Sequence, residues 1–427
     1  MFKNIYTTFA SNFVSALLNL LIAVVISQTL GAHVKGEQSI ILTNIVIILL
    51  FNNIIGGATL VYIVPRFDNR KVLLYSYLWA FIVCFGAFLF TRLVPGLNHK
   101  LLLHTFILTF ISALAAANTM ILLGKEKILA KNAVHILQIL SVAIFLIFAI
   151  FVLNIKNIHS YIYALYFGYG SSLLLSLILL IKHWSTGQQI TDNKHPLIPS
   201  MFRYGFFNQL SHITQMLSLR LSYYLLLIYY GNESVGIYSI AVAITESVWL
   251  ISKSIATVQY ARITNSTDEV YNMQLTVKLL RSSLLFSMVS IIGLSMLPVS
   301  FFRFLFGEEF GPVKQIILLL IPGIFFYNFY LIPGHYFSGK GKYHINTMAS
   351  TIGLIVTLTL SLILIPIYDF YGAAIAGSAS FIATSAYAFI IFRRKSGFPL
   401  REFFPARSDI REYLRFFKKT SNRDAEN

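Results

Sequence analysis

The sequence contains very little charge and almost no cysteine. Of its 427 residues, 11% are charged and 57% are hydrophobic. A soluble globular domain carries about 25% charged residues, so the composition excludes that class of protein. The one cysteine, Cys84, lies within an apolar run and rules out an intrachain disulfide.

Motifs of catalysis and of metal binding are also missing. The sequence has no Walker A loop and no zinc-type spacing of cysteine and histidine. Glu308 and Glu309 are adjacent, and neighbouring side chains do not converge on one substrate as a general acid and base must. We therefore predict no enzymatic activity and no cofactor. The three histidines inside apolar runs are more simply explained by packing than by metal ligation: His104, His135 and His212.

Apolar runs of about 20 residues fill the chain, and each is long enough to cross a bilayer as an α-helix. The predicted fold is therefore an all-α polytopic membrane protein with twelve spans. Their expected ranges are 9–30, 38–64, 73–93, 101–123, 132–153, 161–182, 201–230, 236–262, 276–300, 313–337, 344–367 and 372–393.

One long polar connection, 183–200, separates six spans from six. We expect an N-terminal bundle over 1–182, a C-terminal bundle over 201–393 and a basic tail over 394–427. The loops on the side of the N-terminus carry more Lys and Arg than the opposite loops, one of which contains Lys35. The positive-inside rule then places both termini in the cytoplasm. Since the +17 net charge belongs to these loops and the tail, it does not indicate a nucleic-acid partner.

Two short motifs occur once in each half. LGAHVKGEQSI at 30–40 resembles YGNESVGIYSI at 230–240, and GKEK at 124–127 resembles GKGK at 339–342. Glycine-rich turns can recur by chance, but these two keep the same order. Halves with an even number of spans form parallel repeats, related by an axis along the membrane normal, with the substrate path between them. The pairs that match at an offset of 200 are Gly31/Gly231, Gly36/Gly236, Ser39/Ser239 and Ile40/Ile240.

Three charged residues lie inside the seventh and eighth spans: Arg220, Glu246 and Lys253. A charge within the membrane costs at least a few kcal/mol, so it usually has a partner and a function. Glu246 and Lys253 are seven residues apart and should share one helix face. One hypothesis is a cationic cavity for an anionic group such as a pyrophosphate. The other is a structural Arg220–Glu246 pair that joins two helices and leaves Lys253 as surplus positive charge.

Six further residues complete the candidate substrate site: Gln209, His212, Arg66, Arg262, Asn19 and Asn44. The first two lie on or near the Arg220 face of the seventh span. The two arginines end the second and eighth spans, where they could collect an anion at the inner mouth. The two asparagines could bind sugar hydroxyls, although uncharged amides in membrane bundles commonly join helices instead. The repeat counterparts of Arg220 and Glu246 are Leu20 and Val46, so the cationic wall should come from the C-terminal half.

The basic tail contains a possible amphipathic segment after Ser408. Ile410, Leu414 and Phe417 recur at helical spacing with basic residues among them. Such a helix would lie on the anionic inner leaflet, which predicts anionic lipids as partners. A solvated tail beyond a short helix is the alternative.

Several stretches together resemble a known family. They are FASNFVSALLNLLIAVVISQTLGAHVKGEQSI at 9–40, GNESVGIYSIAVAITESVW at 231–249, LFGEEFGP at 305–312, GKGKYHINTMAS at 339–350 and LILIPIYDFYGAAIAGSAS at 362–380. In this order they are similar to polysaccharide flippases, the O-antigen-flippase-like branch of the multidrug/oligosaccharidyl-lipid/polysaccharide exporter superfamily. The resemblance implies two six-helix bundles around a V-shaped central cavity lined by the first, second, seventh and eighth spans.

The resemblance also implies a function. Such proteins move undecaprenyl-pyrophosphate-linked oligosaccharides to the periplasmic leaflet of the bacterial inner membrane by alternating access. Glu246 would then be the candidate ion-coupling residue, and other polysaccharide-assembly proteins would be expected partners. A drug or cation antiporter of the same superfamily should place acids in its cavity, where only Glu246 qualifies. A glycan polymerase or ligase should carry a larger outer loop, and a scaffold would leave the buried charges unexplained.

Overall fold

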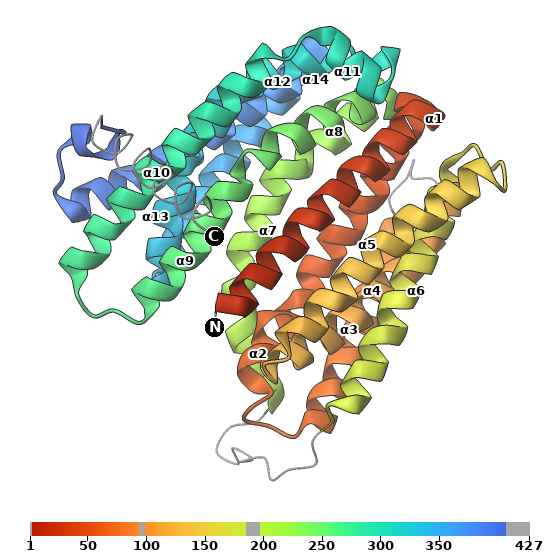
Figure 1. The fold of residues 1–427 in the computed structure, drawn as a ribbon, viewed down its shortest axis with the longest axis horizontal. Helices are drawn as coiled ribbons and strands as arrows, with labels where there is room; N and C mark the ends of the chain where they lie inside the picture. Colours follow the sequence, from red (N-terminus) through yellow and green to blue (C-terminus); the bar gives the residue numbers. More distant parts are fainter. Residues whose placement is uncertain (1, 94–98, 185–196, 407–427) are drawn as a thin grey trace, which may run out of the picture. The chain divides into compact units, whose positions relative to one another are not determined.

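A computed structural model describes residues 2–93, 99–184 and 197–406, which are helices joined by short turns, with no strand in these ranges (Figure 1). The all-α prediction is confirmed. Most of the predicted linker and the whole predicted amphipathic segment lie outside the described residues. The elements are α1 (Phe2–Gly56), α2 (Ala58–Ile63), α3 (Asn69–Leu93), α4 (His99–Gly124), α5 (Ile128–Phe151), α6 (Ile158–Lys182), α7 (Leu197–Tyr230), α8 (Asn232–Ser247), α9 (Trp249–Thr264), α10 (Glu269–Met296), α11 (Val299–Phe306), η1 (Glu308–Phe310), α12 (Val313–Phe326), α13 (Asn328–Gly339), α14 (Tyr343–Ser396) and η2 (Leu400–Phe403).

Within the described ranges, eight helical segments are long and apolar enough to cross a membrane, or nine if the bent pair α8 and α9 forms one span. Two of them, α1 and α14, are each interrupted by a single non-helical residue. These are Gly31 (φ 80°, ψ 179°) and Asp369 (φ 50°, ψ −134°). Both fall where the sequence predicts a turn between spans. The chain is thus a multi-pass helical membrane protein, while the number twelve stays a prediction.

The chain packs as two compact units. Unit 1 contains Met1–Ser239 and Phe302–Gly311, and unit 2 contains Ile240–Phe301 and Pro312–Asn427. These two units are defined by which residues pack together, whereas the predicted bundles over 1–182 and 201–393 are defined by the repeated sequence motifs. The predicted bundle boundaries therefore remain a prediction.

The repeated glycines adopt the same backbone conformation. Gly31 has φ 80° and Gly231 has φ 82°, a region that glycine enters without steric cost. Each is a one-residue break, because the helix resumes at Ala32 in α1 and at Asn232 in α8. The sequence predicts a longer first turn, up to residue 37, and this part of the prediction is wrong. Lys35 consequently belongs to a helix and not to a loop.

The GKEK motif at 124–127 and the GKGK motif at 339–342 also adopt the same backbone conformation. Glu126 (φ 60°) and Gly341 (φ 69°) take positive φ at equivalent positions. The N–H of Lys127 donates to the Leu122 carbonyl at 2.9 Å, and the N–H of Lys342 donates to the Phe337 carbonyl at 2.8 Å. This bond across five residues is the helix-ending Schellman arrangement.

The predicted eighth span, 236–262, is not a single straight helix. Helices α8 and α9 meet at a 45° bend, and the N–H of Val248 donates to the carbonyl of Thr245, three residues back. The hydroxyls of Thr245 and Ser247 bond to carbonyls of the preceding turn, which is an arrangement that bends helices. Glu246 and Lys253 therefore lie on either side of this bend, and a shared helix face for them stays a prediction.

The segment Phe302–Gly311, which contains most of the LFGEEFGP stretch, packs within unit 1 against the break in α1. The Glu309 Oε2 atom accepts from the N–H of Ala32 at 2.6 Å, and the Gln28 side chain donates to the Phe304 carbonyl at 2.6 Å. A carboxylate at this place satisfies one of the free N–H groups that open the resumed helix and complements its dipole. The adjacent Glu308 instead faces outward and lies 3.5 Å from Arg303. The two glutamates thus have separate surroundings.

Alanine at position 309 should lower the stability of unit 1 by about 1 kcal/mol, because the helix that starts at Ala32 loses its cap. Alanine at position 308 should change it by less than about 0.5 kcal/mol, since Glu308 forms an exposed ion pair. Thermal unfolding of the two purified variants in the same detergent measures the difference. Equal shifts would show that Glu309 does not act as a cap.

Unit 2 has a polar core around Asn328, which is fully buried. Its Oδ1 atom accepts from Ser252 at 2.8 Å and from Ser283 at 2.6 Å, and its Nδ2 atom donates to the Phe325 carbonyl at 2.9 Å. These bonds join α9 and α10 to the break between α12 and α13. In a bilayer such polar groups must find partners inside the protein, and here they do.

Candidate functional site

Arg220 lies near the middle of α7 in unit 1, and its side chain is partly buried. Its Nη1 atom donates to the Tyr223 hydroxyl at 3.0 Å, and the guanidinium lies 5.1 Å from the centre of that ring. The hydroxyl and the ring face of Tyr223 thus hold the guanidinium from within the same helix.

The neighbouring Tyr224 connects α7 to α1. Its hydroxyl donates to the Oδ1 atom of Asn44 at 2.6 Å. The backbones of α7 and α1 also approach each other closely at Gly205, where an added Cβ would lie 1.6 Å from the Ile54 carbonyl oxygen. The bond to Tyr224 supports the helix-joining alternative for Asn44, whose role toward sugar stays a prediction.

Lys35 is the residue that the sequence interpretation missed. It is 6% exposed, and its Nζ atom donates to Gln38 Oε1 at 2.6 Å and to Ser39 Oγ at 2.9 Å. The positive charge of Arg220 acts on it electrostatically. Spacings of three and four residues put Gln38 and Ser39 on the Lys35 face of one helix, and this pattern was the available signal. Unit 1 thus contains two basic side chains that interact electrostatically.

The other predicted residues of unit 1 are more scattered. Gln209 on α7 is buried, and Asn19 on α1 is exposed; no described contact joins either of them to Arg220. His212 on α7 and Arg66, which follows α2, both have exposed side chains. Their assignment to the substrate site stays a prediction.

The predicted residues of unit 2 lie on α8 and α9. Glu246 is partly buried, and Arg262 is exposed in the last turn of α9. Lys253 is exposed, with its Nζ atom 5.7 Å from the centre of the Trp249 ring. Because Arg220 belongs to unit 1 and Glu246 to unit 2, the Arg220–Glu246 pair also remains a prediction.

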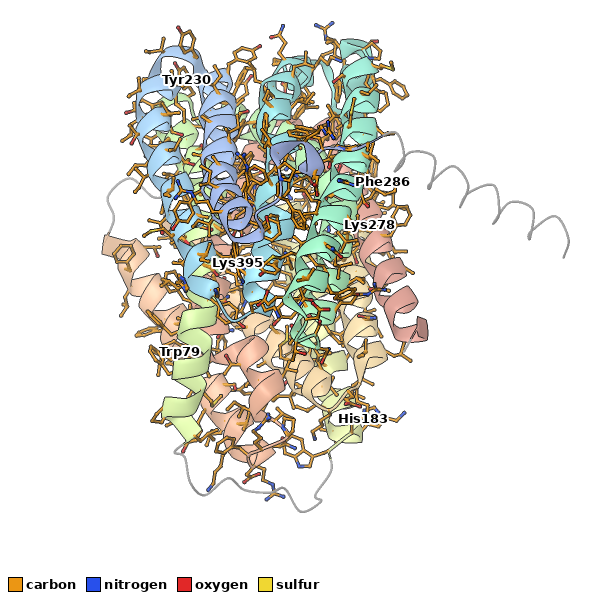
Figure 2. The ribbon with its side chains drawn as sticks, turned by 90° about the vertical axis from the view of Figure 1, so that its left-hand side faces the viewer. Trp79, His183, Tyr230, Lys278, Phe286 and Lys395 are labelled. Atoms are coloured by element: carbon orange, nitrogen blue, oxygen red, sulfur yellow. The ribbon has the colours of Figure 1, made fainter. Side chains whose placement is uncertain are left out.

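A separate charged cluster in unit 2 joins the ends of α10, α13 and α14. The Tyr336 hydroxyl donates to Glu269 Oε2 at 2.9 Å, and Lys395 (Figure 2) donates to that hydroxyl at 2.6 Å. The Nζ atom of Lys340, from the GKGK motif, lies 3.7 Å from Glu269. Because the carboxylate is shared by two lysines and a tyrosine, this cluster is a structural connection between helices. In the described part of the chain, no group of three or more His, Cys, Asp or Glu is placed to hold a metal ion.

Comparison with known sequences connects the C-terminal part to polysaccharide biosynthesis. The family described as "Polysaccharide biosynthesis protein" matches residues 254–417. The capsular polysaccharide biosynthesis protein CapF of Staphylococcus aureus is 27% identical over 168 residues, which cover 38% of this chain and 42% of CapF. The chain thus matches less than half of the length of CapF. The resemblance predicted from the sequence motifs is confirmed.

Comparison with solved structures extends the likeness to almost the whole chain. The lipid II flippase MurJ in an inward closed conformation has a TM-score of 0.72 at 18% identity, covering 93% of this chain and 89% of MurJ. An inward-facing MATE family multidrug transporter of the MOP superfamily has a TM-score of 0.67 at 14% identity, covering 90% and 94%. A variant of the Vibrio cholerae MATE transporter VcmN has a TM-score of 0.66 at 11% identity, covering 94% and 98%. The protein therefore has the fold of MOP-superfamily flippases and transporters.

Proposed function

We propose that the protein moves an undecaprenyl-pyrophosphate-linked oligosaccharide from the cytoplasmic to the periplasmic leaflet of the bacterial inner membrane, with both of its termini in the cytoplasm. The observation that carries this proposal is the partly buried Arg220 on α7, the predicted seventh span, in a chain that has a transporter fold and matches polysaccharide biosynthesis proteins. Guanidinium groups bind phosphate oxygens in pairs, and an ammonium group adds a mobile point charge. Arg220 and Lys253 would accordingly hold the pyrophosphate.

The remaining predicted residues take supporting roles in this proposal. Arg66 and Arg262 collect the pyrophosphate at the inner mouth, and the polar groups of Gln209, His212, Asn19 and Asn44 meet the sugars. The polyprenyl chain stays in the lipid. The tail binds anionic lipids, and other polysaccharide-assembly proteins supply or consume the lipid-linked oligosaccharide.

Transport proceeds by alternating access, and no covalent chemistry or cofactor takes part. A ligand moves such an equilibrium only through unequal affinity for the two states. The pyrophosphate therefore has to be bound more tightly in one state than in the other. Glu246 is the residue assigned to ion coupling, because it is the acid inside the predicted eighth span.

The likeness to MATE transporters supports a second candidate, a multidrug or cation antiporter. A cationic substrate would be repelled by Arg220 and Lys253, with Glu246 as the acid available to attract it. The charge of these residues therefore favours an anionic substrate. Resistance to cationic drugs that depends on the protein would support the antiporter instead.

Mass spectrometry of membrane lipids from a deletion strain tests the proposal. We expect finished undecaprenyl-pyrophosphate-linked repeat units to accumulate and to return to the parental level when the wild-type chain is restored. A deletion strain with unchanged lipid-linked oligosaccharides and altered drug sensitivity would overturn the proposal in favour of the antiporter.

A further inference from the structure

Lys35 is a buried basic residue that the proposed substrate site does not use. Its Nζ atom has two neutral hydrogen-bond acceptors, on Gln38 and Ser39. Among the residues that the structure describes, no carboxylate lies within ion-pair distance of Lys35, and the charge that acts on it is the like charge of Arg220. A buried charge without an opposite partner is costly.

The hydrogen bonds alone do not explain why this residue is a lysine. A glutamine amide also has two N–H donors and could reach the same acceptors without any charge to desolvate. The ability of Lys35 to carry a positive charge is therefore the feature that calls for a ligand. An anionic group would supply the neutralising charge that the described neighbours lack.

Lys35 and Arg220 lie at different distances from the repeated glycines. Lys35 is four residues after Gly31, and Arg220 is eleven residues before Gly231. At about 1.5 Å of rise per residue, these separations are about 6 Å and about 16 Å along their helices. Lys35 is thus nearer to the end of the spans that carries the two glycine breaks.

Two further glycines form a close contact beside Lys35. A Cβ added to Gly36 would lie 1.8 Å from the Asn232 carbonyl oxygen, and a Cβ added to Gly236 would lie 2.0 Å from the Ala32 carbonyl oxygen. The residues involved correspond to each other in the repeat, so the contact is reciprocal, as around a local two-fold axis. It brings the start of α8 against the first turn of the resumed α1. With this contact closed, Lys35 is buried.

We propose that Lys35 is a second binding residue for the anionic group of the substrate, uncovered when the contact between Gly36 and Gly236 separates. The pyrophosphate is then passed from Arg220 toward Lys35 as this end of the protein opens. This inference rests on the proposed function, and it assigns the exit step of that same path to a residue of the N-terminal half. The cationic path is then not confined to the C-terminal half.

The first test replaces the charge while keeping the hydrogen bonds. Lys35→Gln should reduce export of the oligosaccharide about tenfold or more, because one charge-assisted contact is lost, while Lys35→Arg should retain most of it. The thermal midpoint of Lys35→Gln should be unchanged or higher, since a buried charge is removed. Lys156→Gln, at an exposed lysine, is the matched control and should export normally. Normal export by Lys35→Gln, or a loss explained by a lower midpoint, would overturn the inference.

The second test measures whether position 35 becomes accessible. In a Cys84→Ala background, Lys35→Cys should react with 2-aminoethyl methanethiosulfonate in transporting cells, and the attached cationic group should restore export. The neutral methyl methanethiosulfonate should react without restoring it. His33→Cys, at an exposed position, reports that the reagent reaches the turn. Reaction at position 33 with none at position 35 would contradict the proposed opening.

The two proposals fail in different ways. If the wild-type chain does not restore the lipid profile of the deletion strain, the proposed function itself is wrong. If the wild type restores it and Lys35→Gln does so equally, only the role of Lys35 is wrong.

Discussion

Export of the lipid-linked oligosaccharide is expected to be abolished by Arg220→Ala, with the variant still folded and inserted. A guanidinium that binds a pyrophosphate makes charge-assisted hydrogen bonds of about 1.5–3 kcal/mol each. Loss of two such bonds lowers the affinity by a factor of about 100 or more. Surface polysaccharide in a complemented deletion strain measures export, and the amount of membrane-inserted protein must match the wild type.

Tyr223→Phe is the matched control for Arg220→Ala. It removes the hydroxyl that accepts from Arg220 and keeps both the ring and the charge. Export should be largely retained. Arg220→Lys should be intermediate, because an ammonium cannot bind phosphate in the paired geometry of a guanidinium.

A charge exchange separates the substrate role from the structural pair. The double variant Arg220→Glu/Glu246→Arg should stay inactive if Arg220 binds the substrate, because the cation has moved to another helix. Recovery of export by the double variant would show that the two residues form a structural pair.

A methyl group at Gly36 is expected to destabilise unit 1 strongly. The added Cβ would lie 1.8 Å from the carbonyl oxygen and 2.6 Å from the carbonyl carbon of Asn232. Because these are backbone atoms, no side-chain rotation can relieve the clash, and overpacking of this kind costs about 3 kcal/mol or more. Gly36→Ala should therefore lower the thermal midpoint of the purified protein markedly and prevent the contact with α8 from closing.

Gly86→Ala provides the control, since a Cβ there meets nothing within 4 Å on the same kind of helix. Alanine favours a helix over glycine by about 1 kcal/mol, so this variant should be unchanged or slightly more stable. Similar midpoints for Gly36→Ala and Gly86→Ala would show that α1 and α8 are not in close contact in solution.

The sequence predicts most of the secondary structure correctly, because span-length apolar runs and glycine breaks are local features. The positions of the breaks at Gly31, Gly231 and Asp369 follow from such signals. The bend at Val248 does not, since it depends on which carbonyls the Thr245 and Ser247 hydroxyls select.

The candidate site is harder to predict, because burial depends on packing between helices. The sequence predicts a loop position for Lys35, whereas in the structure the helix resumes at Ala32 and packs against α8. In the sequence, Glu309 is recognisable only as the neighbour of another acid, Glu308. Its contact with Ala32 could not be predicted, because the two residues are 277 positions apart. Arg220 is identifiable from sequence because a charge inside an apolar run is conspicuous by itself.

Translocation by the purified protein is the most direct measurement of the proposed activity. Proteoliposomes would carry a fluorescent undecaprenyl-pyrophosphate-linked oligosaccharide, and a membrane-impermeant quencher would report how much of it crosses the bilayer. We predict rapid crossing with the wild-type protein and crossing at the rate of protein-free liposomes with Arg220→Ala. Equal crossing with both proteins would contradict the role of Arg220, and no crossing above protein-free liposomes with the wild type would contradict the flippase assignment.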